Sequence, residues 1–124
     1  MTRQMREQKV EELRKEAEAN GYGYFGGKYI QPPEEYRLRS KELSCISMID
    51  SILCYNCRGW QDATRVLEYE ETSYHNYLEE YVELFGRDKV IELIQGQIDS
   101  IESVSVGVYT DDEGCTYNSI NYKN

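Results

Sequence analysis

Hydrophobic residues along this 124-residue chain recur at helical spacing as far as about residue 101, and they alternate with polar residues after it. The first helical segment follows Thr2, a residue typical of helix N-caps, and runs to Asn20, where Gly21 supplies a stop. Its apolar stripe is thin: Met5, Val10, Leu13 and Ala17. This pattern predicts a surface helix with one narrow buried edge.

A second helical pattern runs from residue 34 to about residue 56, with a break near Ser44 left open. Its second half is apolar nearly all round, which predicts the central buried helix. The residues concerned are Leu43, Cys45, Ile46, Met48, Ile49, Ile52 and Leu53. Residues 60–67 then predict a short helix anchored by Trp60, Ala63 and Leu67.

Two further helices are predicted on either side of Gly86. The first is capped by Thr72 or Ser73 and ends at Phe85, and the second is capped by Asp88 and continues to about Ile101. The short link predicts a tight helical hairpin. The core side of the first would carry Tyr74, Leu78, Tyr81, Val82 and Phe85, and that of the second Val90, Ile91, Ile94, Ile98 and Ile101.

The last segment has the two-residue period of a β-hairpin. Val104, Val106 and Val108 alternate with small residues, residues 111–114 form the turn, and residues 115–122 return. Earlier, residues 21–33 predict either a hairpin turning at Gly26–Gly27 or a loop. An isolated hairpin is marginally stable, so the C-terminal one must pack on a helix or pair with the earlier one. The chain is therefore expected to be one α+β domain, residues 1–124, with about five helices and a small antiparallel sheet.

Charge is distributed unevenly along the chain, whose net charge is −9. Residues 1–65 hold 11 Lys and Arg against 10 Asp and Glu, whereas residues 66–124 hold 3 against 13. Such an asymmetry favours a basic partner. Direct binding to nucleic acid or to an acidic membrane surface is disfavoured, because both need a cluster of basic residues.

Residues 68–83 combine carboxylates with tyrosines and contain no Lys or Arg. Carboxylates beside tyrosine rings can dock on Arg and Lys clusters that normally hold phosphates. A second acidic group is predicted at the hairpin tip. The alternative is an ordinary solvated acidic surface. The candidate partner-binding residues are Glu68, Glu70, Glu71, Tyr77, Glu79, Glu80, Glu83, Asp111, Asp112 and Glu113.

Catalytic and metal-binding motifs are weak. Cys54 and Cys57 have the C-x-x-C spacing, which is open to three interpretations: buried thiols, half of a zinc site, or a redox pair. A redox pair is disfavoured at the end of a helix where the dipole opposes a thiolate. His75 is the single histidine and is more typical of a solvated or capping residue. We therefore expect no enzyme activity, no cofactor and no metal.

The closing stretch from Gly107 to Ile120, GVYTDDEGCTYNSI, resembles the ends of small uncharacterised accessory proteins of mobile elements and phages of Gram-positive gut bacteria. The likeness extends loosely to residues 58–60 and 79–97. Small size and acidity also resemble anti-CRISPR and antirestriction proteins, several of which mimic nucleic acid. This resemblance assigns no functional residue, because such inhibitors share no common motif.

The resemblance and the charge together suggest a stoichiometric inhibitor of a bacterial defence nuclease, above all a CRISPR effector of the Cas9 type. An acidic surface would block the basic surface on which that nuclease holds DNA. The alternative is an adaptor of a mobile element that binds a basic replication or transfer protein. With no apolar run near the roughly 18 residues of a membrane span and no apolar signal segment, a cytoplasmic location in the bacterial host is expected.

Overall fold

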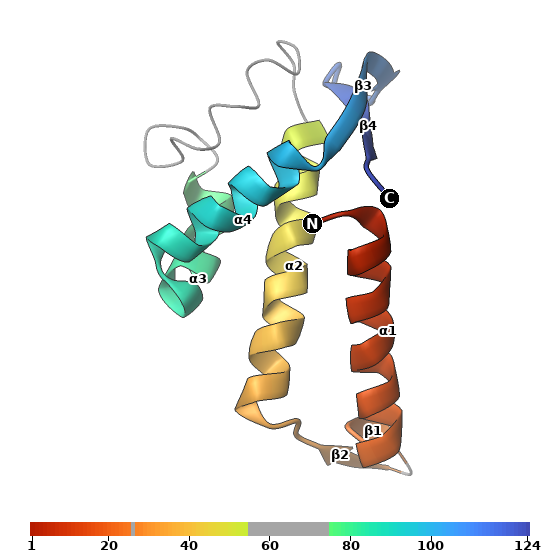
Figure 1. The fold of residues 1–124 in the computed structure, drawn as a ribbon, viewed down its shortest axis with the longest axis vertical. Helices are drawn as coiled ribbons and strands as arrows, with labels where there is room; N and C mark the ends of the chain where they lie inside the picture. Colours follow the sequence, from red (N-terminus) through yellow and green to blue (C-terminus); the bar gives the residue numbers. More distant parts are fainter. Residues whose placement is uncertain (26, 55–74) are drawn as a thin grey trace.

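The computed structural model describes residues 1–25, 27–54 and 75–124, and it has the expected α+β architecture (Figure 1). Four helices and two separate two-stranded antiparallel sheets are found in this part of the chain. In chain order the elements are α1 (Arg3–Asn20), β1 (Gly23–Phe25), β2 (Lys28–Ile30), α2 (Glu34–Cys54), α3 (His75–Phe85), α4 (Arg87–Asp99), β3 (Ile101–Thr110) and β4 (Thr116–Tyr122). The fifth helix expected at residues 60–67 lies outside the described residues.

The core forms where α2, α3 and α4 meet. Its fully buried side chains lie on the faces that helical spacing predicts, and β3 and β4 contribute Ile101 and Ile120 at its edge. Helix α2 is continuous through Ser44, so no break occurs there. The buried hydrophobic residues of this core are Cys45, Ile49, Ile52, Leu53, Leu78, Tyr81, Val90 and Ile94.

Helix α1 lies beside α2 but buries none of its residues (Figure 1). The Thr2 hydroxyl accepts a hydrogen bond from the Met5 amide, and Gly21 ends the helix with a φ of 68°, as expected. Polar contacts attach α1 to α2: Arg6 pairs with Asp50, Arg39 with Glu16 at 2.6 Å, and the Tyr36 hydroxyl donates to the Leu13 carbonyl. This helix is therefore held mainly by side-chain hydrogen bonds and ion pairs.

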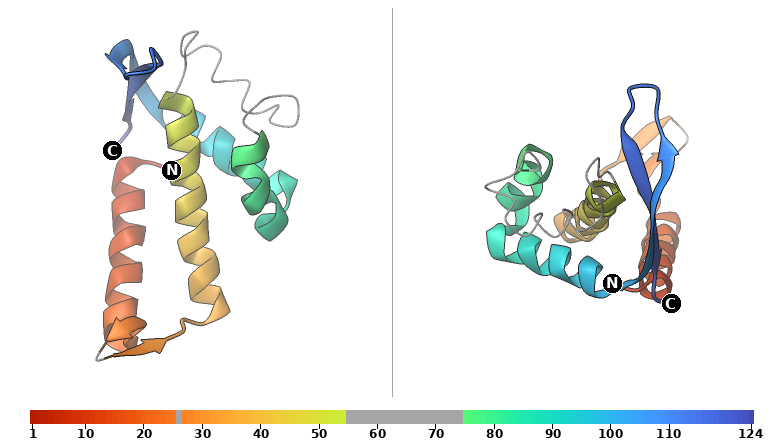
Figure 2. Two further views of the ribbon diagram at one scale, coloured as in Figure 1. Left: turned by 180° about the vertical axis from the view of Figure 1, so that it is seen from behind. Right: turned by 90° about the horizontal axis from the view of Figure 1, so that it is seen from above.

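The two hairpins lie at opposite ends of the molecule (Figure 2). Strands β1 and β2 pair with Phe25 opposite Lys28, so these residues form the hairpin rather than the loop; Gly26 of the predicted turn lies outside the described residues. The C-terminal hairpin does not pair with them; its base packs against the helices instead, through Ile101 and Ile120. Helix α4 begins at Arg87, with Gly86 rather than Asp88 as its N-cap, and ends at Asp99, because Ile101 already belongs to β3.

Candidate functional site

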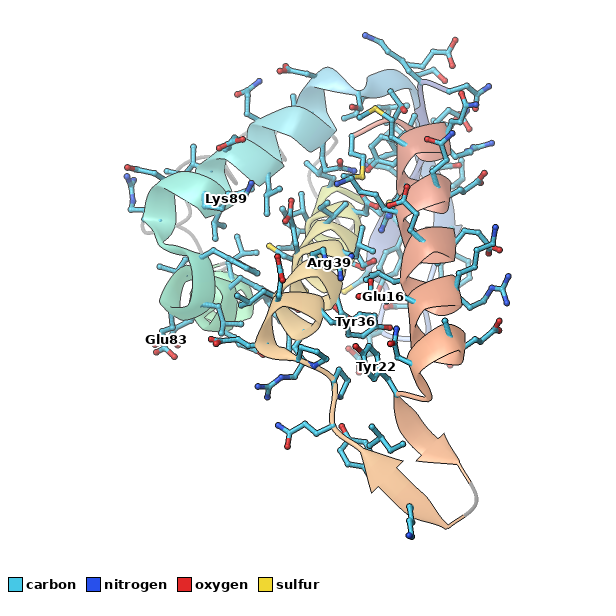
Figure 3. All side chains as sticks on the ribbon, turned by 60° about the horizontal axis from the view of Figure 1, so that its bottom comes forward. Glu16, Tyr22, Tyr36, Arg39, Glu83 and Lys89 are labelled. Carbon is cyan, nitrogen blue, oxygen red and sulfur yellow. The ribbon has the colours of Figure 1, made fainter. Side chains whose placement is uncertain are left out.

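The sequence places three of the candidate carboxylates on the outer face of α3. Leu78 and Tyr81 are buried, and Val82 and Phe85 pack against the core, so helical geometry turns the remaining positions to solvent. Tyr77, Glu79, Glu80 and Glu83 are all exposed, and Tyr77 retains 58% of its accessible surface. We call these four residues the α3 acidic surface. Figure 3 shows Glu83 pointing away from the body of the molecule.

The carboxylates of this surface differ in their partners. Glu80 forms an ion pair with Lys41 of α2 at 2.8 Å, and this contact raises the pKa of the Lys41 ammonium. Neither Glu79 nor Glu83 has an ion-pair partner within the described residues. Among the described residues, the α3 acidic surface therefore presents two uncompensated negative charges, Glu79 and Glu83, one helical turn apart.

The position of these two charges is unfavourable for the helix itself. Glu79 and Glu83 are four residues apart, where like charges repel. Glu83 also lies in the last turn of α3, at the negative end of the helix dipole, and that turn contains no basic residue. Stability of the helix therefore does not explain why both positions carry carboxylates.

The hairpin tip divides its three acidic residues between two roles. Asp111 works inside the turn: one carboxylate oxygen accepts from the amides of Glu113 and Cys115, and the other accepts from the Tyr117 hydroxyl at 2.9 Å. These hydrogen bonds, above all that from Cys115, lower the pKa of Asp111. Asp112 and Glu113 are exposed. Of the three residues expected to bind a partner, only these two present free carboxylates to solvent.

The structure does not join the two acidic groups into one surface. Helix α3 precedes the start of α4 and the hairpin follows its end, and 13 helical residues span about 20 Å. Figure 1 shows α3 and the hairpin on opposite sides of the molecule. The remaining candidates, Glu68, Glu70 and Glu71, lie outside the described residues.

Four basic residues of the first half form ion pairs within the protein: Arg6, Arg14, Arg39 and Lys41. Arg14 contacts Glu11 and Glu18, Arg39 contacts Glu16, and these contacts raise the pKa of both guanidinium groups. Figure 3 shows Arg39 directed toward Glu16, close to Tyr36 and Tyr22. The positive charges of Arg14 and Arg39 are thereby neutralised locally, whereas the negative charges of Glu79 and Glu83 have no such partner among the described residues.

A buried polar junction joins α1, α2 and α4, and sequence reasoning missed it. Asp50 accepts from Arg6 and from the Gln97 amide at 2.8 Å, and Gln97 is only 1% exposed. The nitrogen of Met1 donates to Gln97 and to the Ser100 hydroxyl at 2.8 and 2.9 Å. The sequence signal that could have revealed this junction is Asp50, a single aspartate within the apolar half of α2. Because its groups satisfy one another, the junction explains how α1 is attached rather than indicating a ligand site.

An open groove runs between α1 and α2. Val10, Leu13 and Leu43 line its apolar part. The arginines at its rim, Arg6 and Arg14, are already paired with carboxylates. Neither arginine is therefore a free charge that could orient a ligand.

The cysteines show no chemistry of their own in the described part of the chain. Cys45, Cys54 and Cys115 form no disulfide there, and burial raises the pKa of Cys45 to about 12 and also raises that of Cys54. No group of three metal-ligating side chains occurs among the described residues, and Cys57 lies outside them. Helix α3 starts at His75, whose side chain is not among those described.

No protein-family model, curated protein or solved structure matches this chain. Within the described residues, no helix has both the length and the apolar character needed to cross a membrane.

Proposed function

We propose that this protein is a stoichiometric inhibitor of a bacterial nucleic-acid-targeting defence nuclease, a CRISPR effector of the Cas9 type. In this proposal it acts by binding and not by catalysis. The observation that carries it is the pair Glu79 and Glu83, which are exposed one helical turn apart and uncompensated within the described residues. Carboxylates at the spacing of one helical turn can contact the Arg and Lys side chains that a nuclease uses to hold phosphates.

Two further features support a partner of this class. The chain is net negative by nine charges, so attraction to a basic groove would accelerate association, and this effect weakens with salt. Tyr77 adds apolar contact area at low entropic cost. The likeness of the closing residues to accessory proteins of mobile elements directs the proposal to defence nucleases among basic proteins.

The decisive experiment titrates the protein into purified Cas9-type effectors loaded with guide RNA, and measures target-DNA binding and cleavage. Inhibition should saturate at one protein per effector and weaken as salt increases. Glu79→Lys/Glu83→Lys should abolish inhibition. The matched control is Glu7→Lys/Glu12→Lys, which makes the same charge change at two exposed positions of α1 and should retain inhibition.

Three results would contradict the proposal: undisturbed cleavage by every effector tested, equal loss in both variants, or inhibition at substoichiometric amounts. An adaptor of a mobile element predicts a different outcome. It would bind a basic replication or transfer protein through Glu79 and Glu83 without inhibiting any nuclease.

A further inference from the structure

Helix α1 lies on the side of α2 that faces away from α3, as Figure 1 and Figure 2 show. None of its 18 residues is buried, and among the described residues no side chain in the hydrophobic core, or packed against it, comes from α1. The core of α2, α3 and α4 can therefore stay packed without α1. Segments with few buried apolar contacts are the ones that open locally while the rest of a protein stays folded.

The apolar part of the contact between α1 and α2 is small. Two hollows lie along this contact, and Leu13 of α1 and Leu43 of α2 line both of them. Both leucines are only half-buried, and Val10 of α1 keeps 52% of its accessible surface. Separating the two helices would therefore expose little additional apolar surface to water.

Ion pairs hold α1 near both of its ends. Towards its start, Arg6 pairs with Asp50 and also donates to the Ser47 hydroxyl at 2.7 Å. Towards its end, Glu16 accepts from Arg39 at 2.6 Å, and Figure 3 shows these two side chains directed toward each other. The side chains of Arg39 and Glu16 are 47% and 33% exposed, so dissolved ions screen the attraction between them.

The remaining attachments of α1 are hydrogen bonds. The Tyr36 hydroxyl donates to the Leu13 carbonyl at 3.1 Å, and the Arg3 amide donates to the Lys123 carbonyl at 2.9 Å. The nitrogen of Met1 donates to the polar junction described above. Water replaces each of these partners once the helix leaves, so the net contribution of each bond is far smaller than its intrinsic strength.

The face of α2 that α1 covers is largely polar. Ser40, Ser44 and Ser47 line the groove there. The Ser44 hydroxyl donates to the Ser40 carbonyl at 3.2 Å within α2, and Asp50 keeps the Gln97 amide as a donor at 2.8 Å. Exposing this face to water would therefore leave its polar groups satisfied.

A pivot follows α1 directly. Gly21 ends the helix with a φ of 68°, a conformation that glycine adopts at little cost. The next residue, Tyr22, packs against the Tyr36 ring of α2 with ring centroids 5.1 Å apart. The β1–β2 hairpin thus has its own contact with α2, and rotation at Gly21 would move α1 alone.

We propose that α1 is a strap that undocks from α2 by turning at Gly21 while the core of α2, α3 and α4 stays folded, and that ionic strength sets the docked fraction. At low salt the ion pairs keep α1 on α2. At high salt they weaken, and α1 separates more often. Undocking uncovers the serine-lined face of α2 and frees the Glu16 carboxylate and the Arg39 guanidinium. This response to salt does not involve the α3 acidic surface.

Hydrogen exchange of the full chain, followed segment by segment with mass spectrometry, tests this proposal. An isolated helix of this length is marginal in water, so the amides of undocked α1 exchange readily. Between about 0.01 M and 1 M salt the screening length falls from about 30 Å to about 3 Å. Over this range the protection of α1 amides should fall about tenfold, which corresponds to about 1.4 kcal/mol, while the protection of the α2 and α4 amides stays the same.

Charge exchange across the contact provides the variants. Glu16→Lys places a like charge beside Arg39 and should lower the protection of α1 at low salt. Adding Arg39→Glu to the same chain should restore it. The matched control is Glu18→Lys, because the ion pair of Glu18 is with Arg14 inside α1, and this variant should leave docking intact.

Four results would overturn the proposal. The protection of α1 could be independent of salt, or α1 and the core could lose protection together, which would show that salt weakens the whole fold. Glu18→Lys could lower the protection of α1 as much as Glu16→Lys does. The chain with both Glu16→Lys and Arg39→Glu could fail to regain the protection of the parent.

Discussion

Neutralising Glu83 should make the protein more stable. In Glu83→Gln, the repulsion from Glu79 one turn earlier disappears, which contributes about 0.2–0.5 kcal/mol. The unfavourable interaction with the negative end of the α3 dipole disappears too, which contributes about 0.3–1 kcal/mol at low salt. The free energy of unfolding should rise by about 0.5–1.5 kcal/mol, and the melting temperature by about 2–8 °C.

Urea unfolding at low ionic strength, followed by circular dichroism, measures this change. In 1 M salt the gain should largely vanish, because the screening length falls to about 3 Å. The matched control is Glu80→Gln on the same helix, which removes the ion pair with Lys41 and should give no gain. If Glu83→Gln is no more stable than the parent, or if Glu80→Gln stabilises equally, then the charges on α3 are not held at a cost to the fold. The exposed pair Glu79 and Glu83 would then give no evidence of a partner.

Three further outcomes follow from the packing, the hairpin and the thiols. Ile49→Ala should lower the free energy of unfolding by about 2–5 kcal/mol, whereas Met5→Ala on α1 should change it by less than about 0.5 kcal/mol in the same urea titration. Gly107→Ala should cost about 1–2 kcal/mol, because φ is 67° and the new methyl group would lie 3.4 Å from a Thr116 carbon. Cys45 is buried and should react with thiol reagents only after unfolding. Because its pKa is raised to about 12 in the folded state, its contribution to stability is complete below pH 9 and should be lost as the pH rises toward 12. The decline in stability over that range should therefore be smaller in Cys45→Ala.

The helices and their buried faces could be predicted because short-range physics determines them. The N-cap at Thr2 and the stop at Gly21 follow from local hydrogen bonding, and the helical spacing of Leu78 and Tyr81 identifies the buried side of α3. The start of α4 was wrong by two residues, because Gly86 occupies the N-cap position that the Asp88 side chain was expected to fill.

The site could be predicted only in part, since contacts between distant residues decide which charges stay free. Glu79 and Glu80 are adjacent in the sequence, yet Lys41 neutralises only Glu80. Asp111 has a sequence signal in retrospect, because aspartate often accepts hydrogen bonds from the amides that follow it in a turn. No local pattern reveals that Asp50 meets Arg6 and Gln97, which are more than 40 residues away in either direction.

The contact between Arg3 and Lys123 joins segments separated by 120 positions. Helix α1 has no fully buried residue and is held by polar contacts with α2 and by this backbone hydrogen bond, so its docking is complete only when residues near Lys123 are in place. During synthesis, α1 would precede α2, α3, α4 and both strands of the C-terminal hairpin, yet it would dock fully only after β4 has been made. Until then, the face of α2 that it covers stays open to chaperones and proteases, and a nascent chain stalled before β4 would show α1 as readily cleaved while the mature protein resists.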